Sequence, residues 1–306
     1  MEPEMTRGLG WIPDVPSFKD YTLESATVQK LIAKTKLAGH PGSPGSPRAS
    51  VRSAGAGAGA AVAPAAAPAL ATHVDVRAFF SPVEDQGNYN SCTANAAVGL
   101  VEYFEKRSFN TFIDASRMFT WKATHDLMGW SGNTGAYIRT TMEALVLFGT
   151  PPEKYWGYDA AHFDVEPTAF CYAFAENYKT IQYLRLDPAA LTPAQVLDSV
   201  RLLLAHGIPS MFGFPVYQEF DHPDNGKIAY PSPTSRSRGG HAICTAGYDD
   251  NMMIGSDKGA LLVRNSWGTT WGDAGYGWLS YKYVTQGLTA DWWALISERW
   301  VNTGAF

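Results

Sequence analysis

Cys92 is the residue in this sequence best placed to act as a nucleophile. It precedes an apolar-periodic run in which Ala94, Val98 and Val101 recur at helical spacing, so we expect it to begin a helix. The positive end of the helix dipole and the free backbone N–H groups there favour the thiolate, which is the nucleophilic form. A lone cysteine is more often a small buried residue. The chemical interpretation therefore requires a base and an oxyanion donor elsewhere in the chain.

His241 and Asn265 are candidates for the base and for the group that orients it. His241 follows two glycines at the start of a predicted strand, and Asn265 ends another apolar strand before Ser-Trp-Gly. The amide oxygen of Asn265 could accept the N–H of one imidazole nitrogen and leave the other facing a thiolate. Trp267 could keep water from that hydrogen bond. Taken singly, a core histidine and a turn with packed tryptophans remain open interpretations.

Gln86 is a candidate oxyanion donor, because its side-chain amide has N–H groups and no charge. It lies six residues before Cys92, and the two could form a two-donor oxyanion hole from the Gln86 amide and the Cys92 backbone N–H. The alternative for Gln86 alone is an ordinary loop glutamine.

Composition excludes several classes of protein. A net charge of -5 argues against a dedicated nucleic-acid binder, and three cysteines in 306 residues do not make a disulfide framework. The histidines lack metal-ligand spacing and no phosphate-binding glycine loop precedes a helix, so we expect no metal and no cofactor. We find no secretory signal and no stretch that could span a membrane. We expect a soluble monomer that is cytoplasmic or exported by another route.

Three regions differ in composition. Residues 1–38 contain a proline-stiffened apolar strap, Gly8 to Tyr21, followed by a predicted short helix at 22–37, and they are a possible prosegment. Residues 39–70 are almost all Gly, Ala, Ser, Pro and Val, which is linker composition. Residues 71–306 form the expected folded body. The strap could partly cover a cleft of that body or pack on the back of a lobe.

The body changes from helical to β-rich along its length. An extended segment at 73–80 precedes helices predicted from Cys92, at 115–124 with Asp114 as the cap, and at 137–148. Thr192 with Pro193 and Gln195 predicts a further capped helix. Strands are predicted at 208–217, 240–247, 260–265, 277–283 and 291–296. This order indicates two lobes of an α+β protein.

These segments together resemble the papain family of cysteine peptidases. The resemblance lies in Gln86-Gly87 before Ser91-Cys92, in Gly240-His241-Ala242, and in Asn265-Ser266-Trp267-Gly268 followed by Trp271-Gly272 and Gly275-Tyr276, all in the family's order. It implies a helical N-terminal lobe and an antiparallel, β-barrel-like C-terminal lobe with the cleft between them. It also implies thiol-dependent hydrolysis of a peptide or protein substrate through a thioester.

The resemblance implies a role for each candidate residue. Cys92 would be the nucleophile, His241 the general base and acid, and Asn265 the residue that orients His241. Gln86 and the Cys92 backbone N–H would form the oxyanion hole. The resemblance also implies that Gly132, Gly135, Gly240 and Trp267 contact the substrate or shield the site. Gly132 and Gly135 resemble the family's glycine strip, which holds the substrate backbone beside the cleft.

The sequence also departs from familiar members of the family. Tyr89, Asn90 and Thr93 stand where a cysteine, a glycine and a tryptophan usually flank the nucleophile, so the helix-lobe disulfide is absent. The usual helical prosegment pattern is absent too, and these features resemble a bacterial branch that includes xylellain. We expect a peptidase, made as a zymogen if the N-terminal segment covers the cleft. The alternatives are acyl transfer or deamidation by the same residues, or a non-catalytic binding protein.

Overall fold

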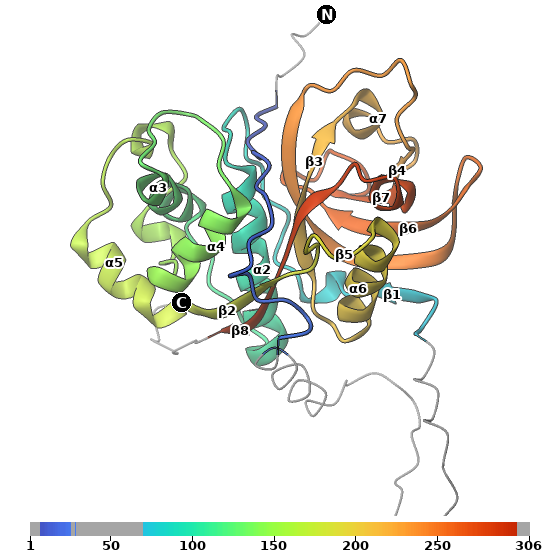
Figure 1. Cartoon of the computed structure of the whole chain (residues 1–306). Helices are drawn as coiled ribbons and strands as arrows, with labels where there is room; N and C mark the ends of the chain where they lie inside the picture. Colours follow the sequence, from blue (N-terminus) through green and yellow to red (C-terminus); the bar gives the residue numbers. More distant parts are fainter. Residues whose placement is uncertain (1–6, 26–27, 29–69, 299–306) are drawn as a thin grey trace, which may run out of the picture.

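The computed structural model describes residues 7–25, 28 and 70–298. The predicted helix at 22–37 lies largely outside these residues, and the predicted linker lies outside them except for Leu70. Figure 1 shows a group of helices beside a twisted sheet, with the strap running between the two. This is the two-lobe α+β arrangement that the sequence predicts.

Among the residues that the structure describes, the helical lobe contains four α-helices and short 3₁₀ turns. The helices are α2 (Cys92–Phe109), α3 (Arg117–Met128), α4 (Ile138–Leu147) and α5 (Ala169–Ala175). The 3₁₀ turns are η1 (Arg77–Phe79), η2 (Glu153–Tyr155), η3 (Ala160–His162) and η4 (Glu176–Tyr178). The predicted helix start at Cys92 is that of α2, and the predicted helix at 137–148 agrees with α4 to within one residue at each end. Helix α3 begins two residues later and ends four residues later than the predicted helix at 115–124.

The prediction that Asp114 caps α3 is wrong. The cap is Ser116, whose hydroxyl accepts the N–H of Phe119 at 3.0 Å. Ala115 instead forms a β-bridge with Pro152. That bridge keeps the chain extended past Asp114, so the helix cannot begin before Ser116.

The β-rich lobe is one sheet with eight strands among the described residues. These are β1 (His73–Asp75), β2 (Thr180–Arg185), β3 (Ser210–Val216), β4 (Lys227–Ile228), β5 (Gly239–Ile254), β6 (Asp257–Arg264), β7 (Tyr276–Ser280) and β8 (Ala290–Glu298). Their order is β2-β8-β3-β5-β6-β7-β4, and β1 pairs with β5. The helices α6 (Pro193–Ala205), α7 (Gln218–Asp221) and α8 (Lys282–Thr285) lie beside it.

The sheet differs in two respects from the barrel-like lobe that the sequence predicts. Its path runs from β2 to β4 without closing, and the β4–β7 pair is parallel, whereas the other described pairs are antiparallel. The five predicted strands are present as β3, β5, β6, β7 and β8. Strand β2 is not predicted from the sequence, because the aromatic-rich stretch from 153 to 190 has no clear period.

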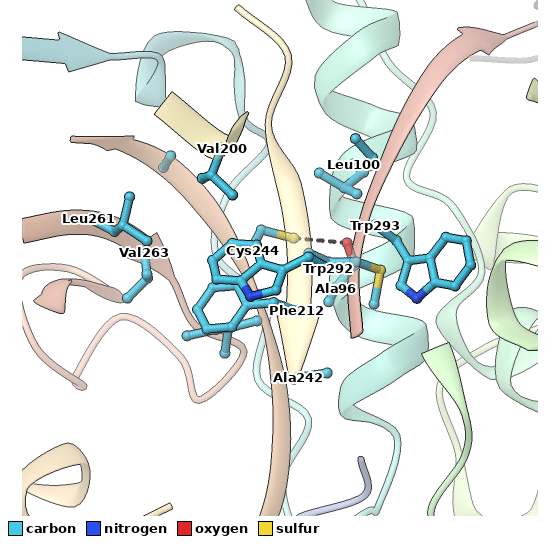
Figure 2. Close-up of a cluster of buried hydrophobic side chains, with 14 of the residues drawn as sticks. Ala96, Leu100, Val200, Phe212, Ala242, Cys244, Leu261, Val263, Trp292 and Trp293 are labelled. Atoms are coloured by element: carbon cyan, nitrogen blue, oxygen red, sulfur yellow. Dashed lines mark hydrogen bonds between the residues drawn. The ribbon is translucent and has the colours of Figure 1, made fainter. Parts of the chain in front are cut away.

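The core of the molecule is centred on α2, which is buried on nearly every side. The sequence predicts one apolar stripe, but α2 packs between α3 and α4 on one side and β5 on the other, so its first twelve residues are all buried. Figure 2 shows the thiol of Cys244 in β5 pointing at the carbonyl of Ala96 in α2, with Sγ and O 3.0 Å apart. Beside this contact the rings of Phe212 and Trp292 stack at 4.0 Å.

The capped helix predicted at Thr192 is α6, and it gives a stability test. Thr192 accepts the N–H of Gln195, and the Gln195 side chain accepts the Thr192 N–H at 2.9 Å. We expect Thr192→Ala to lower the free energy of unfolding by about 1 kcal/mol in urea denaturation, because a helix donor loses its partner. Thr192→Ser keeps the hydroxyl and should lose much less. Equal losses in the two variants would contradict the capping role.

Candidate active site

Cys92 is the first residue of α2, and its thiol is fully buried. The turn that precedes it is held by Asn95, whose side chain donates to the Ser91 carbonyl at 3.0 Å. The main chain at Ala242 and at Gly10 hydrogen-bonds to the thiol. Since Ala242 follows His241, the sulfur lies beside the strand that carries the histidine.

His241 and Asn265 form the hydrogen bond that their sequence context predicts. Nε2 of His241 and Oδ1 of Asn265 are 2.8 Å apart, and both side chains are buried. The ring of Trp267 lies 4.9 Å from the imidazole, at 31° to it, and covers this bond. Among the described residues Nδ1 of His241 has no hydrogen-bond partner. The imidazole is therefore oriented through Nε2, and Nδ1 is left for a second group.

Gln86 is also buried, with its amide fixed at both ends. Its oxygen accepts the hydroxyl of Ser266 at 2.6 Å, and its nitrogen donates to the carbonyls of Tyr89 at 2.8 Å and Gly8 at 3.0 Å. The donor end of the amide thus points at a peptide carbonyl of the strap. The sequence analysis assigned no role to Ser266, although it lies within the motif.

The strap crosses the molecule between the two lobes and hydrogen-bonds to both (Figure 1). On the β side, the amides of Gly10 and Trp11 donate to the Gly240 carbonyl at 2.9 and 3.0 Å. On the helical side, Ala136 donates to Gly10 at 2.7 Å and accepts from Ile12 at 3.1 Å. The strap therefore lies between the two lobes, against Gln86, Gly240 and Ala136, and not on the back of either lobe.

Four glycines allow the strap to lie this close. A Cβ atom at Gly8 or Gly10 would collide with the main chain of Tyr89 and Asn90, and one at Gly135 or Gly240 would collide with the strap. Gly132, predicted beside Gly135, is not part of this contact. It adopts a positive φ of 73° in a turn and donates to Asp164 at 2.6 Å. The strap's hydrogen bonds on this side are made by Ala136, a residue whose type gives no signal in the sequence.

Burial keeps both reactive groups uncharged. Desolvation raises the pKa of the Cys92 thiol to about 12, although the hydrogen bonds from Ala242 and Gly10 lower it in part. Desolvation also lowers the pKa of His241 to about 4, which the bond to Asn265 offsets only in part. At neutral pH the site beneath the strap therefore holds a thiol and a neutral imidazole.

The residues that depart from the family pattern line the strap side of the site. Asn90 accepts the amide of Leu9 at 3.0 Å, and Tyr89 packs against Phe163, with ring centroids 4.9 Å apart. Tyr158 was missed because it lies in the unassigned aromatic stretch. Its hydroxyl donates to the Gln86 carbonyl at 3.1 Å, and it lies 2.5 Å from the hydroxyl of Ser91.

The described part of the chain contains no cluster of three His, Cys, Asp or Glu side chains suited to a metal. Its helices also include none long and apolar enough to cross a bilayer.

The chain combines a two-lobe α+β fold with the buried cluster of Cys92, His241 and Asn265, and comparison with known proteins identifies the family. The profile of papain family cysteine proteases matches residues 70–291, so the chain belongs to that family and is a cysteine-type peptidase.

Three relatives illustrate the extent of the similarity. The chain is 33% identical over 219 residues to an uncharacterized peptidase C1-like protein of Acanthamoeba polyphaga mimivirus, covering 69% of this chain and 68% of that protein. It is 29% identical over 222 residues to digestive cysteine proteinase 2 of Homarus americanus, covering 67% of this chain and 60% of that protein. The crystal structure of xylellain, a cysteine protease from Xylella fastidiosa, superposes with a TM-score of 0.70 at 26% identity and covers 99% of both chains. The predicted papain family, the two-lobe α+β fold and the predicted resemblance to the bacterial protein xylellain are confirmed.

The buried thiols give a prediction for the intact chain. Cys92, Cys171 and Cys244 are all buried and free. We expect iodoacetamide at neutral pH to alkylate Cys92 at least about 100-fold more slowly than in urea, because both exclusion of the reagent and the raised pKa suppress the reactive thiolate. Peptide mass spectrometry would measure this. Alkylation of Cys92 at a similar rate in the folded and unfolded chain would contradict the covered geometry.

Proposed function

We propose that the chain hydrolyses peptide bonds with Cys92 as the nucleophile, His241 as the general base and acid, and Asn265 as the positioning residue. The Cys92 sulfur attacks the substrate carbonyl carbon while its proton passes to Nδ1 of His241. The imidazolium then protonates the leaving amine as the C–N bond breaks, which leaves a thioester. His241 next takes a proton from water as the water oxygen attacks the thioester carbon, and it returns that proton to the sulfur as the C–S bond breaks, which releases the acid and restores the thiol.

The observation that carries this proposal is a hydrogen bond from the side-chain amide of Gln86 to the carbonyl of Gly8, with Gln86 Nε2 and Gly8 O 3.0 Å apart. A peptide carbonyl thus already occupies the donor that the developing oxyanion would use. The main chain at Gly10, two residues further along the strap, approaches the Cys92 thiol and lowers its pKa in part. The strap therefore presents main chain to the donor and to the nucleophile together, as a peptide substrate must.

We further propose that the strap makes the chain a zymogen. It excludes substrate from the cleft, and its burial of Cys92 and His241 disfavours the thiolate–imidazolium pair. Beyond the site the strap is anchored by two arginines. Arg139 pairs with Asp14 and Asp20, and Arg185 donates to the Asp14 carbonyl at 3.1 Å. Activation then requires removal or displacement of the strap, after which exposure allows both groups to ionise.

Displacing the strap within the full chain tests the zymogen proposal. In Gly8→Val/Gly10→Val, new side chains would collide with the main chain of Tyr89 and Asn90, so the strap should leave the cleft. We expect both peptidase activity and the rate at which a thiol-directed epoxide labels Cys92 to rise by more than about 10-fold. The reason is that fewer molecules then have the strap in the cleft. Val15→Ala alters a side chain that is 78% exposed and serves as the control. Rates equal to wild type in the displaced variant would refute inhibition by the strap.

The oxyanion role of Gln86 is tested in the same displaced background. Gln86→Ala removes one donor and should lower kcat by about 10²-fold with a smaller change in KM, because the lost bond acts mainly in the transition state. Cys92→Ser should abolish both hydrolysis and epoxide labelling. If the epoxide labels the Cys92→Ser chain as fast as its parent, the assignment of the nucleophile is wrong.

A further inference from the structure

The strap is held in the cleft by one deeply inserted side chain. Trp11 is only 8% exposed, although Val15 and Phe18 on the same strap are 78% and 96% exposed. Its main chain lies between Gly240 in β5 and Ala136, and it forms a β-bridge with Ala136. The indole therefore enters the β-rich lobe directly beside the proposed reaction site.

Two glycines form the walls of the slot that holds the indole. A Cβ atom at Gly213 in β3 would overlap the ring atoms of Trp11, and one at Gly240 would lie 2.8 Å from its Cε3. The neighbours of Gly213 in the strand are the large buried residues Phe212 and Phe214. Because alternate residues of a strand face opposite sides of the sheet, these two rings point away from Trp11, and the missing side chain of Gly213 leaves the room beside the main chain that the planar indole fills.

Asp291 in β8 closes the far end of the slot. One carboxylate oxygen, Oδ2, accepts the indole Nε1–H of Trp11 at 2.9 Å and the amide of Asp14 at 2.8 Å. The other oxygen, Oδ1, accepts from Arg185 at 2.8 Å. Asp291 is fully buried and has a positive φ of 54°, and its own N–H is held by Asp187 at 2.8 Å. A strained, buried carboxylate aimed into a slot is a feature of ligand-binding sites.

Loss of the strap changes this site in a defined way. Both donors to Oδ2 come from the strap, whereas the donor to Oδ1 belongs to the body. The emptied slot therefore presents one buried oxygen without its strap donors. Arg185 is shared between Asp291 and Asp187. Arg139, which loses its strap partners, lies over the same Trp293 ring as Arg185, so two arginines of the body balance two carboxylates. A flat ring with a neutral N–H at its edge satisfies that oxygen, and a cation would add uncompensated charge beside Arg185.

We propose that this slot is a substrate side-chain subsite and that Asp291 is its specificity-determining residue, selecting peptides with tryptophan at the position beside Ala136 and Gly240. In the covered chain Trp11 occupies the subsite in place of substrate. This inference rests on the proposed peptidase function of the same cleft and specifies its substrate class.

The first test compares two peptides that differ only in the donor. The enzyme is the full chain with Gly8→Val, Gly10→Val and Trp11→Ala, so that the strap is displaced and the slot is empty. Tryptophan is placed in turn at each of three positions on either side of the scissile bond. At the position that gives the fastest cleavage it is replaced by 3-benzothienylalanine, which keeps the ring shape but has sulfur in place of N–H. We expect kcat/KM to fall by about 10- to 100-fold, the loss expected for a hydrogen bond to a charged acceptor.

Substitutions in the slot separate specificity from a structural role. In Asp291→Asn the single amide oxygen is the acceptor for Arg185, which turns the NH₂ group toward the indole. The preference for tryptophan over benzothienylalanine should then fall to about 3-fold or less. In Gly213→Ala the added methyl group fills the slot. The kcat/KM for the tryptophan peptide should then fall at least about 10-fold more than the kcat/KM for a peptide with alanine in place of that tryptophan. A purely structural defect would lower all these rates equally.

A second readout does not depend on hydrolysis. In the otherwise wild-type full chain, Trp11→Phe and Asp291→Asn each remove the same hydrogen bond, so each should speed epoxide labelling of Cys92. The double variant should label no faster than the faster single variant, because the two side chains form one interaction. Multiplicative effects would overturn the Trp11–Asp291 coupling.

The outcomes distinguish this inference from the function on which it rests. Cleavage of the two peptides at equal rates would refute the tryptophan subsite and leave the peptidase proposal intact. Absence of both cleavage and Cys92 labelling in the displaced chain would refute both.

Discussion

The contact between α2 and β5 is the constraint on which the rest of the structure depends. Cys92 is the first residue of α2 and His241 lies near the start of β5, and the two are far apart in the sequence. They are brought together because the small residue Ala96 lets the helix approach Cys244 closely, with a thiol–carbonyl contact of 3.0 Å. Close packing of this kind tolerates little change in volume. The position of the Cys92 sulfur is therefore set by the packing of α2 against β5 rather than by the loops around Cys92.

Burial has two opposite effects at this site. It protects the His241–Asn265 hydrogen bond beneath Trp267, which fixes the imidazole for proton transfer. The same burial, completed by the strap, makes the charged forms of Cys92 and His241 unfavourable. Orientation is therefore present in the covered chain, whereas ionisation is not. In the zymogen proposal, removing the strap would change the solvation of the two groups and leave the His241–Asn265 hydrogen bond in place.

The residues that could be predicted from the sequence were those with a distinctive local context. Cys92 at a helix start, His241 after two glycines and Asn265 before Ser-Trp-Gly each carry a signal within a few residues. The strap could be recognised from its prolines and apolar side chains, but its location could not, because the long linker allows many. The contact between Asp291 and Arg185 could not be predicted, because the two residues are 106 positions apart in the sequence. They lie in β8 and β2, and no family motif falls in either strand. Asp114 was chosen as a cap on residue type alone, and the tertiary bridge at Ala115 prevented it.

The position of β8 within the sheet affects the order in which the protein can form. This strand lies between β2 and β3, so the sheet is incomplete until one of the last described segments has been inserted. It also supplies Asp291, the acceptor for Trp11 at a separation of 280 residues. Contacts this distant in sequence form late, because the intervening chain must first be ordered. The strand that completes the sheet therefore also supplies the buried acceptor for the strap, so the strap cannot be fully secured before the sheet is complete.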